Sequence, residues 1–371
     1  MTGLFDGRIC ALASVSPFTG PETLERRYGR PFAARLGANE SVYGPSPKAI
    51  EAMARVAADG WMYGDPEQFE LREALAAKHG LAIDNIICGT GIDGLLRDLV
   101  AAACSPGSTV LTSRGAYPTF GYFATAAGAV IETVPYTTDF RQNWEALAAR
   151  AREIRPKILY LTNPDNPTGS WRERDTLDAL LATVPEDTIV ALDEAYCDFA
   201  PHDAIAADDL TRPNLLRFRT FSKAYSLAGI RVGYVFGDPV AIQQLSKVRD
   251  HFSVSRISMA GALAALSDRD HLDWVLTEVA KSRTQLALVA EKQGFTALPS
   301  ATNFVAIDLG QGGEYCRLIA EEIEEQGVFI RRPGVEFLNR TLRVSAGTPS
   351  DIERFDEALQ IAVERVSASG G

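Results

Sequence analysis

Histidine and cysteine are scarce in this sequence. Its 371 residues include four histidines and five cysteines, and the cysteines are widely spaced, with no Cys-x-x-Cys pair. Scattered cysteines in odd number predict neither a disulfide framework nor a zinc site, so we expect no metal. We interpret most of the cysteines as small buried apolar side chains, and we favour a structural over a catalytic role for Cys197.

Long apolar runs and an excess of basic residues are also missing. No stretch of about 18 consecutive apolar residues occurs, so no transmembrane helix is predicted. Residues 1–13 lack a long apolar core leading to a cleavage site, which argues against a secretory signal. The 37 Lys and Arg residues are outnumbered by 48 Asp and Glu, and the net charge is −11. We therefore expect a cytoplasmic protein that binds neither membranes nor, nonspecifically, nucleic acids.

The sequence does contain enough apolar residues for a large core, arranged in alternating strands and helices. The chain is 46% hydrophobic, and its length exceeds what one core usually supports, which predicts two domains. Short β-branched runs alternate with amphipathic stretches, and this pattern indicates a mainly parallel sheet covered on both faces. Strands are predicted at 85–88, 109–112, 130–135, 158–162, 188–192, 216–220 and 232–236, and helices at 94–103, 144–153 and 174–183.

The pattern changes after about residue 240. Two long helices are predicted there, at 242–266 and 271–293. A smaller mixed unit follows, with strands near 303–308, 328–331 and 341–345, a helix at 314–326 and a last helix at 349–366. We predict a large α/β domain at 41–270 and a smaller α+β domain formed by 1–40 and 271–371.

Segment 89–94 (Gly-Thr-Gly-Ile-Asp-Gly) lies between a predicted strand and a predicted helix and fits the GxGxxG pattern. A dinucleotide site would also need an acidic residue about 20 positions further on, and residues 108–120 contain none. The remaining interpretation is a helix N-terminus whose backbone N–H groups suit one phosphate. A plain tight turn explains the motif nearly as well.

Two further motifs follow predicted strands. Segment 163–169 (Asn-Pro-Asp-Asn-Pro-Thr-Gly) forms a rigid turn at the carboxyl end of a strand, where ligands bind in open α/β sheets, although a turn without function would explain it alone. In segment 193–196 (Asp-Glu-Ala-Tyr), Asp193 ends an apolar strand. A buried carboxylate is costly without a partner, so either a structural salt bridge or a protonated ring nitrogen is expected beside it.

Lys223 stands in the fourth motif, at 220–233, directly after a predicted strand and within a run of small residues. Desolvation there would lower the pKa of its amine, as imine chemistry requires. Ser222 and Arg231 flank it with a hydroxyl and a guanidinium, which are both good phosphate partners. A lone lysine at a strand end would be interpreted as a surface residue, but in this segment we infer a reactive amine.

Taken in order, these motifs resemble those of the fold-type-I, class I/II aminotransferases that depend on pyridoxal 5′-phosphate (PLP). The position of Asp193, 27 residues after Asn166, and the pattern SKxxxLAGxRxG from Ser222 to Gly233 carry the resemblance. Within that family the chain is most similar to the histidinol-phosphate aminotransferase branch. The resemblance implies the PLP-transferase fold type I, an α/β fold with a mainly parallel seven-stranded large domain and a smaller α+β domain.

The resemblance also implies roles for individual residues. Lys223 would hold the cofactor as a Schiff base and then move the proton between the substrate Cα and the cofactor. Asp193 would pair with the protonated pyridine nitrogen and keep the ring an electron sink. Asn166 and Tyr196 would hydrogen-bond the phenolic oxygen, and Tyr117 would stack on the ring.

The family pattern assigns a further group of residues to the cofactor phosphate. These are the amides of Gly91, Ile92 and Asp93 together with Ser222 and Arg231. At Ile92 an apolar side chain replaces the usual side-chain donor. Tyr63 resembles the tyrosine that reaches the phosphate of the partner subunit's cofactor, which implies a homodimer with shared active sites.

The resemblance identifies the substrate-binding residues less precisely than the cofactor-binding ones. Arg343 matches the arginine that holds a substrate carboxylate or phosphate, and Arg331 matches a second anion-binding arginine, although Arg332 beside it leaves the alignment open by one position. Asn39 and Phe18 fall at other substrate-binding positions. Phe18 stands where the family usually has tyrosine, and an apolar ring suits an aromatic or aliphatic substrate better than histidinol phosphate.

The function predicted from these residues is transamination. An amino group would move between a histidinol phosphate-like or aromatic substrate and a 2-oxo acid such as 2-oxoglutarate. PLP-dependent decarboxylation or oxidation on the same scaffold is the alternative, because the motifs do not fix which bond to Cα lies perpendicular to the ring. A nucleotide-dependent oxidoreductase that uses segment 89–94 is a more distant alternative.

Overall fold

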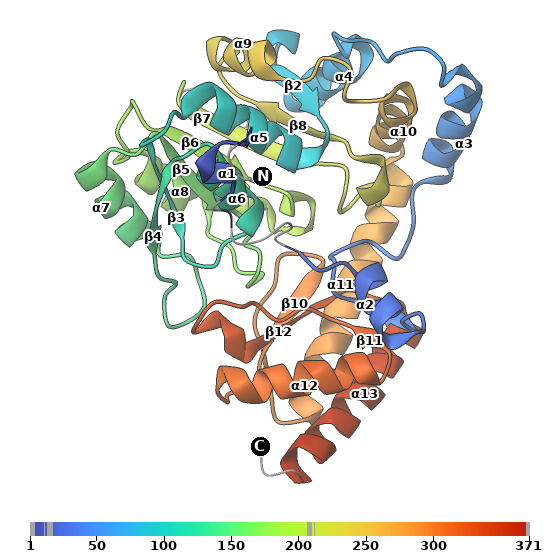
Figure 1. The fold of residues 1–371 in the computed structure, drawn as a ribbon. Coiled ribbons are helices and arrows are strands. Elements are labelled where there is room, and N and C mark those ends of the chain that lie inside the picture. Colours follow the sequence, from blue (N-terminus) through green and yellow to red (C-terminus); the bar gives the residue numbers. More distant parts are fainter. Residues whose placement is uncertain (1–3, 11, 13–17, 206–209, 211, 369–371) are drawn as a thin grey trace.

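The computed structural model describes residues 4–10, 12, 18–205, 210 and 212–368. Its largest sheet has seven strands in the order β2-β8-β7-β6-β5-β3-β4 (Figure 1). β8 runs antiparallel to β2 and β7, and the other pairs are parallel. This confirms the predicted mainly parallel sheet. The strands are β2 (Ile86–Gly89), β3 (Thr109–Ser113), β4 (Val130–Val134), β5 (Ile158–Thr162), β6 (Ile189–Asp193), β7 (Leu215–Thr220) and β8 (Gly233–Phe236).

Helices cover both faces of this sheet because its strands are apolar on both sides. Successive residues of a strand point to opposite faces. Val110 and Tyr160 therefore pack with the first group of helices, while Leu111 and Leu159 pack with the second. The first group is α5 (Gly91–Ala103), α6 (Pro118–Ala126) and α9 (Pro239–Val248), and the second is α7 (Trp144–Ile154) and α8 (Arg174–Leu181).

The single long helix predicted at 242–266 is wrong. The chain forms two helices there, α9, which ends at Val248, and α10 (Arg256–Ser267). Between them the Asp250 carboxylate accepts a hydrogen bond from the Phe252 backbone, and Ser255 caps α10 by accepting one from Ser258 N–H. Such short polar side chains compete with the helical backbone and favour turns and caps over helix interiors. The next helix, α11 (Arg269–Lys292), is close to its prediction.

The C-terminal part of the chain forms a second unit with its own core, drawn in orange and red in Figure 1. Its strands β9 (Thr296–Ala297), β10 (Phe304–Asp308) and β12 (Thr341–Ser345) form an antiparallel sheet. β1 (Ala34–Arg35) pairs with β11 (Val328–Phe329), so the N-terminal segment joins this unit. That pairing supports the predicted domain division, whose boundaries stay a prediction. The remaining helices are α1 (Gly7–Cys10), α2 (Pro21–Tyr28), α3 (Pro47–Val56), α4 (Phe69–His79), α12 (Gly313–Glu325) and α13 (Pro349–Ala368).

Within the described ranges, no helix combines the length and the apolar content that a membrane span requires.

Candidate active site

A cavity of about 410 Å³ opens at the carboxyl ends of β5, β6 and β7. This is the edge of an open α/β sheet where ligands bind. The cavity brings together thirteen of the residues that the sequence singled out. They are Phe18, Asn39, Ile92, Asp93, Tyr117, Asn166, Asp193, Tyr196, Ser222, Lys223, Arg231, Arg331 and Arg343. Gly91 and Tyr63 do not line it.

The Nζ atom of Lys223 donates a hydrogen bond of 3.0 Å to the backbone oxygen of Asn39. Its Nζ also lies 5.9 Å from the centre of the Tyr196 ring. Burial, and after it the positive charge of Arg343, lower the pKa of the Lys223 amine to about 8. An amine with this pKa is partly neutral near physiological pH, as a nucleophile or a base must be.

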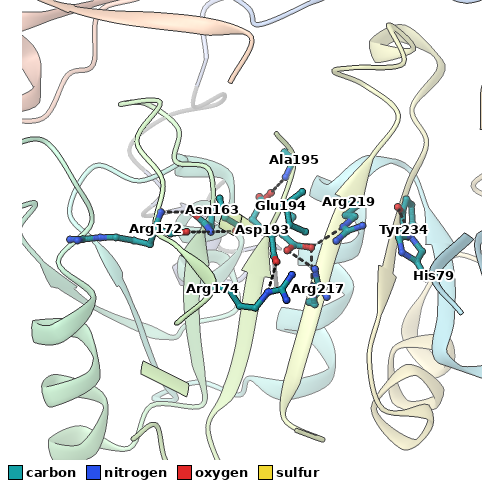
Figure 2. Close-up of polar contacts among 12 residues, drawn as sticks. His79, Asn163, Arg172, Arg174, Asp193, Glu194, Ala195, Arg217, Arg219 and Tyr234 are labelled. Carbon is teal, nitrogen blue, oxygen red and sulfur yellow. Dashed lines mark hydrogen bonds and ion pairs between the residues drawn. The ribbon is translucent and has the colours of Figure 1, made fainter. Parts of the chain in front are cut away.

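Asp193 and Glu194 are adjacent carboxylates with different surroundings (Figure 2). Glu194 is buried and forms ion pairs of 2.8 Å with both Arg217 and Arg219. Asp193 accepts hydrogen bonds from the Tyr160 hydroxyl at 2.7 Å and from the backbone N–H of Ala195 at 3.0 Å. Within the described residues no cation pairs with Asp193, and burial raises its pKa to about 7.

Tyr196 lies at the centre of a set of amide contacts. Its hydroxyl oxygen is 2.9 Å from Nδ2 of Asn39 and 3.4 Å from Nδ2 of Asn166. The Oδ1 atom of Asn166 accepts a hydrogen bond from Nη1 of Arg343 at 2.7 Å. Burial raises the pKa of the Tyr196 phenol to about 12, so it stays protonated.

The start of α5 forms one end of the cavity. The helix begins at Gly91, three residues before the predicted start at Gly94, so Gly91, Ile92 and Asp93 form its first turn. Gly91 has a φ of 74°, and a Cβ there would lie 2.5 Å from Nη2 of Arg231. Only glycine fits such a position, because the backbone is left-handed and the guanidinium lies against it.

The side chains around this helix start are polar. Arg231 Nη1 lies 3.4 Å from the Ser222 hydroxyl, and Nη2 lies 3.9 Å from the Asp93 carboxylate. Asp93 also accepts a hydrogen bond of 3.4 Å from Tyr117, whose phenol has a pKa raised by burial. The Phe18 ring stacks on Tyr117 with centroids 5.7 Å apart and is 41% exposed at the cavity. Ser16 and Pro17, which precede Phe18, lie outside the described residues.

Of the two adjacent arginines, Arg331 reaches the cavity and Arg332 does not. Arg331 lines it, makes an isolated antiparallel bridge to Arg343, and donates to the Thr19 backbone oxygen at 2.6 Å. Arg332 is not among the lining residues and donates instead to the backbone oxygen of Asn339. Burial lowers the pKa of Arg331 and of Arg343, that of Arg343 to about 10.

Tyr63 lies on the surface. Its side chain is 77% exposed and its ring is 4.8 Å from that of Phe252. Cys197 is buried and burial raises its pKa strongly, which supports a structural thiol.

The sequence interpretation missed several residues that hold the site. Tyr160 looks like a core residue because it stands in a fully buried strand, yet its hydroxyl binds Asp193. Asp165 accepts hydrogen bonds from Tyr136, Gln142 and Thr168 and thereby fixes the turn that carries Asn166. The only local signal for Asp165 is a charged residue inside a Pro-rich turn.

Residues 34–359 match the family model of aminotransferase class I and II. The chain belongs to this family. Histidinol-phosphate aminotransferase from Sinorhizobium meliloti, solved in complex with pyridoxal-5′-phosphate, has a TM-score of 0.94 and 43% identity, over 98% of each chain. Histidinol-phosphate aminotransferase 1 of Mesorhizobium japonicum is 35% identical over 93% of this chain and 95% of its own length. The aromatic amino acid aminotransferase of Rhodococcus erythropolis is also 35% identical, over 91% and 94%.

Family membership confirms the predicted aminotransferase function and the fold-type-I architecture. It also excludes the alternative function of a nucleotide-dependent oxidoreductase that uses segment 89–94, because that segment begins a helix at the cavity of an aminotransferase.

Proposed function

We propose that this aminotransferase binds PLP on Lys223 and transfers an amino group between an aromatic or phosphate-bearing amino substrate and a 2-oxo acid. One observation carries the proposal. A partly buried amine with a lowered pKa, Lys223, lines the same cavity as a buried carboxylate, Asp193, which has no paired cation among the residues that the structure describes.

The cavity residues fit the parts of the cofactor. A protonated ring nitrogen would supply the cation that Asp193 lacks. The N–H groups at the start of α5, with Ser222 and Arg231, suit the phosphate. When bound, PLP supplies an electron sink that makes the substrate Cα–H acidic.

The chain's own groups would then do the positioning and proton transfer. The Lys223 amine would take the proton from the substrate Cα and deliver it to the cofactor, which its pKa of about 8 permits near neutral pH. Tyr196 and Asn166 would hydrogen-bond the phenolic oxygen, and Tyr117 would cover the ring. Arg343 would hold a substrate carboxylate through its planar fork.

Two observations bear on the substrate. Arg331, partly buried at the cavity, suits a second anion such as a phosphate or a distal carboxylate. Phe18, stacked on Tyr117, offers an apolar face to an aromatic side chain. The two kinds of relative, named for histidinol phosphate and for aromatic amino acids, match these two features.

A half-reaction experiment tests the proposed function. The PLP-loaded protein is mixed separately with L-glutamate, L-phenylalanine and histidinol phosphate, and the visible absorption of the cofactor is followed. We expect the band to be lost with L-glutamate and with at least one of the other two, and restored by 2-oxoglutarate. Release of carbon dioxide or peroxide with these donors, without formation of the amino form of the cofactor, would instead support decarboxylation or oxidation.

We also propose a homodimer in which Tyr63 serves the partner subunit's site. The support is a largely exposed tyrosine beside the half-exposed Phe252, as expected for side chains that another chain covers. Sedimentation should give twice the mass of the chain, and Tyr63→Phe should weaken PLP binding about tenfold without dissociating the dimer, because one hydrogen bond is lost. Unchanged PLP affinity would rule out this role.

Location in the cytoplasm stays a prediction.

A further inference from the structure

Ser345, the last residue of β12, is connected to the phenol of Tyr196 through the side chain of Asn39. The backbone N–H of Asn39 donates to the Ser345 hydroxyl at 2.9 Å, and that hydroxyl lies 3.1 Å from Oδ1 of Asn39. The other end of the same amide, Nδ2, is 2.9 Å from the Tyr196 hydroxyl. Ser345 is 1% exposed and is not part of the cavity lining.

The backbone of Asn39 is fixed in place. It has a φ of 54°, in the left-handed region that few residues other than glycine adopt. Its carbonyl oxygen accepts hydrogen bonds of 3.0 Å from Nδ2 of Asn303 and from Nζ of Lys223. With the backbone held, the main freedom left to this residue is a flip of its side-chain amide.

The Ser345 hydroxyl decides which way that amide points. It already accepts from the Asn39 N–H, and its own proton has no acceptor other than Oδ1 of Asn39 among the described residues. A flipped amide would leave a buried O–H donor unpaired, which costs about 1–3 kcal/mol. Oδ1 therefore faces Ser345, and Nδ2 faces Tyr196.

Arg343 decides the second amide in the same way. A guanidinium can only donate, so the atom of Asn166 that contacts Nη1 of Arg343 at 2.7 Å is an oxygen. Nδ2 of Asn166 consequently faces the Tyr196 hydroxyl, at 3.4 Å.

Both lone pairs of the Tyr196 oxygen thus receive amide donors, and the phenolic proton is left to point into the cavity that Tyr196 lines. We propose that Ser345 is a positioning residue, which orients the Asn39 amide so that Tyr196 donates its proton to the ligand in the cavity. The inference rests on the proposed function, in which that ligand is PLP and the acceptor is its phenolic oxygen.

The test is a pH titration of the visible absorption of the PLP-loaded protein. In Ser345→Ala the Asn39 amide can flip, and Tyr196 then donates to Oδ1 of Asn39 instead of to the cofactor. A phenolate that loses a donor is less stable, so the cofactor holds its proton more tightly. We expect the apparent pKa of the absorption change to rise by about half a unit to one unit, the shift that corresponds to one hydrogen bond.

Two controls separate this role from loss of packing. Ser345→Thr keeps the hydroxyl and should retain the wild-type titration. Ser282→Ala removes another buried serine hydroxyl nearby, which accepts from Gly347 N–H and does not contact Asn39, and should also leave the titration unchanged. If Ser345→Ala does not fold, Asn39→Asp is tested instead. A carboxylate can only accept hydrogen bonds, so Tyr196 should donate its proton to residue 39 and the apparent pKa should rise as expected for Ser345→Ala.

A double-mutant cycle completes the experiment. Tyr196→Phe has no proton to orient, so adding Ser345→Ala to it should cause no further shift. The proposal is wrong if Ser345→Ala leaves the titration of the wild-type background unchanged, or shifts the Tyr196→Phe background by the same amount. A wild-type protein that shows no visible band with PLP would overturn the proposed function first, and this inference with it.

Discussion

Replacing Lys223 by alanine is expected to lower transamination by a factor on the order of 10⁴ or more. The variant loses the amine that attaches the cofactor and the base that moves the Cα proton, and general-base catalysis alone contributes up to about 10⁴-fold. Single-turnover kinetics with L-glutamate and the PLP-loaded variant measure the effect. Lys247→Ala, which removes an exposed lysine that donates to Gln244 outside the cavity lining, should keep wild-type kinetics. Substantial turnover by Lys223→Ala would refute the central role of this residue.

The same lysine makes the cofactor-free protein less stable at neutral pH. Its pKa falls from an ordinary 10.5 to about 8 on folding, so the unfolded chain binds the proton more tightly. The cost is complete below pH 8, and it disappears as the pH rises through 10.5, because both states are then neutral. Lys223→Met, which keeps the apolar stem, should therefore be more stable than the cofactor-free wild type by about 3 kcal/mol at pH 7.

Thermal or denaturant unfolding at pH 7 and pH 10 checks this dependence. The stability difference between Lys223→Met and the wild type should shrink as the pH rises. An inactive variant that gains stability also shows that the loss of turnover does not come from misfolding. A difference that stays constant with pH would mean that the amine is not desolvated.

Much of the site could be predicted from the sequence because its chemistry is encoded in short segments. The turn at 163–169, the carboxylate that ends β6 and the lysine after β7 each lie at the carboxyl end of a parallel strand. Parallel strands bring those ends together at one edge of the sheet, so the segments meet without any knowledge of long-range packing. The cavity contains thirteen of the fifteen predicted site residues, and Asn166, Asp193, Ser222 and Lys223 meet there for this reason. The cavity residues Phe18, Asn39, Arg331 and Arg343 lie outside these strands and were predicted from the family resemblance alone.

The residues that could not be predicted depend on contacts between distant segments. Ser345 and Asn303 bind Asn39 across separations of 306 and 264 residues, and neither carries a local signal of function. Ser345 lies two residues after Arg343 in a strand without unusual features. Its proposed role can be inferred only from the direction in which its hydroxyl donates a hydrogen bond. The break between α9 and α10 was missed because the apolar spacing continues through it, while the capping by Ser255 is a weaker signal.

The neighbouring carboxylates Asp193 and Glu194 give the second large prediction. Successive residues of a strand point to opposite faces, so Asp193 faces the cavity while Glu194 meets Arg217 and Arg219, which share one face of β7. Asp193→Asn should lower kcat by on the order of 10²–10³, because the cavity loses the carboxylate proposed to stabilise a protonated ring nitrogen. Steady-state kinetics and the PLP dissociation constant measure this loss.

Asp193→Asn and Glu194→Gln should change the free energy of unfolding in opposite directions. Burial raises the pKa of Asp193 from an ordinary 3.8 to about 7, so the penalty on the folded cofactor-free protein grows as the pH rises above 3.8 and is complete above 7, and Asp193→Asn removes it. Glu194→Gln instead leaves two buried guanidinium groups without their shared carboxylate charge, which should cost about 3–5 kcal/mol of unfolding free energy. Denaturant unfolding of both variants at pH 8 compares them directly. If Asp193→Asn were destabilised as much as Glu194→Gln and kept its kcat, Asp193 would be a structural residue. Its proposed role beside a protonated ring nitrogen would then be wrong.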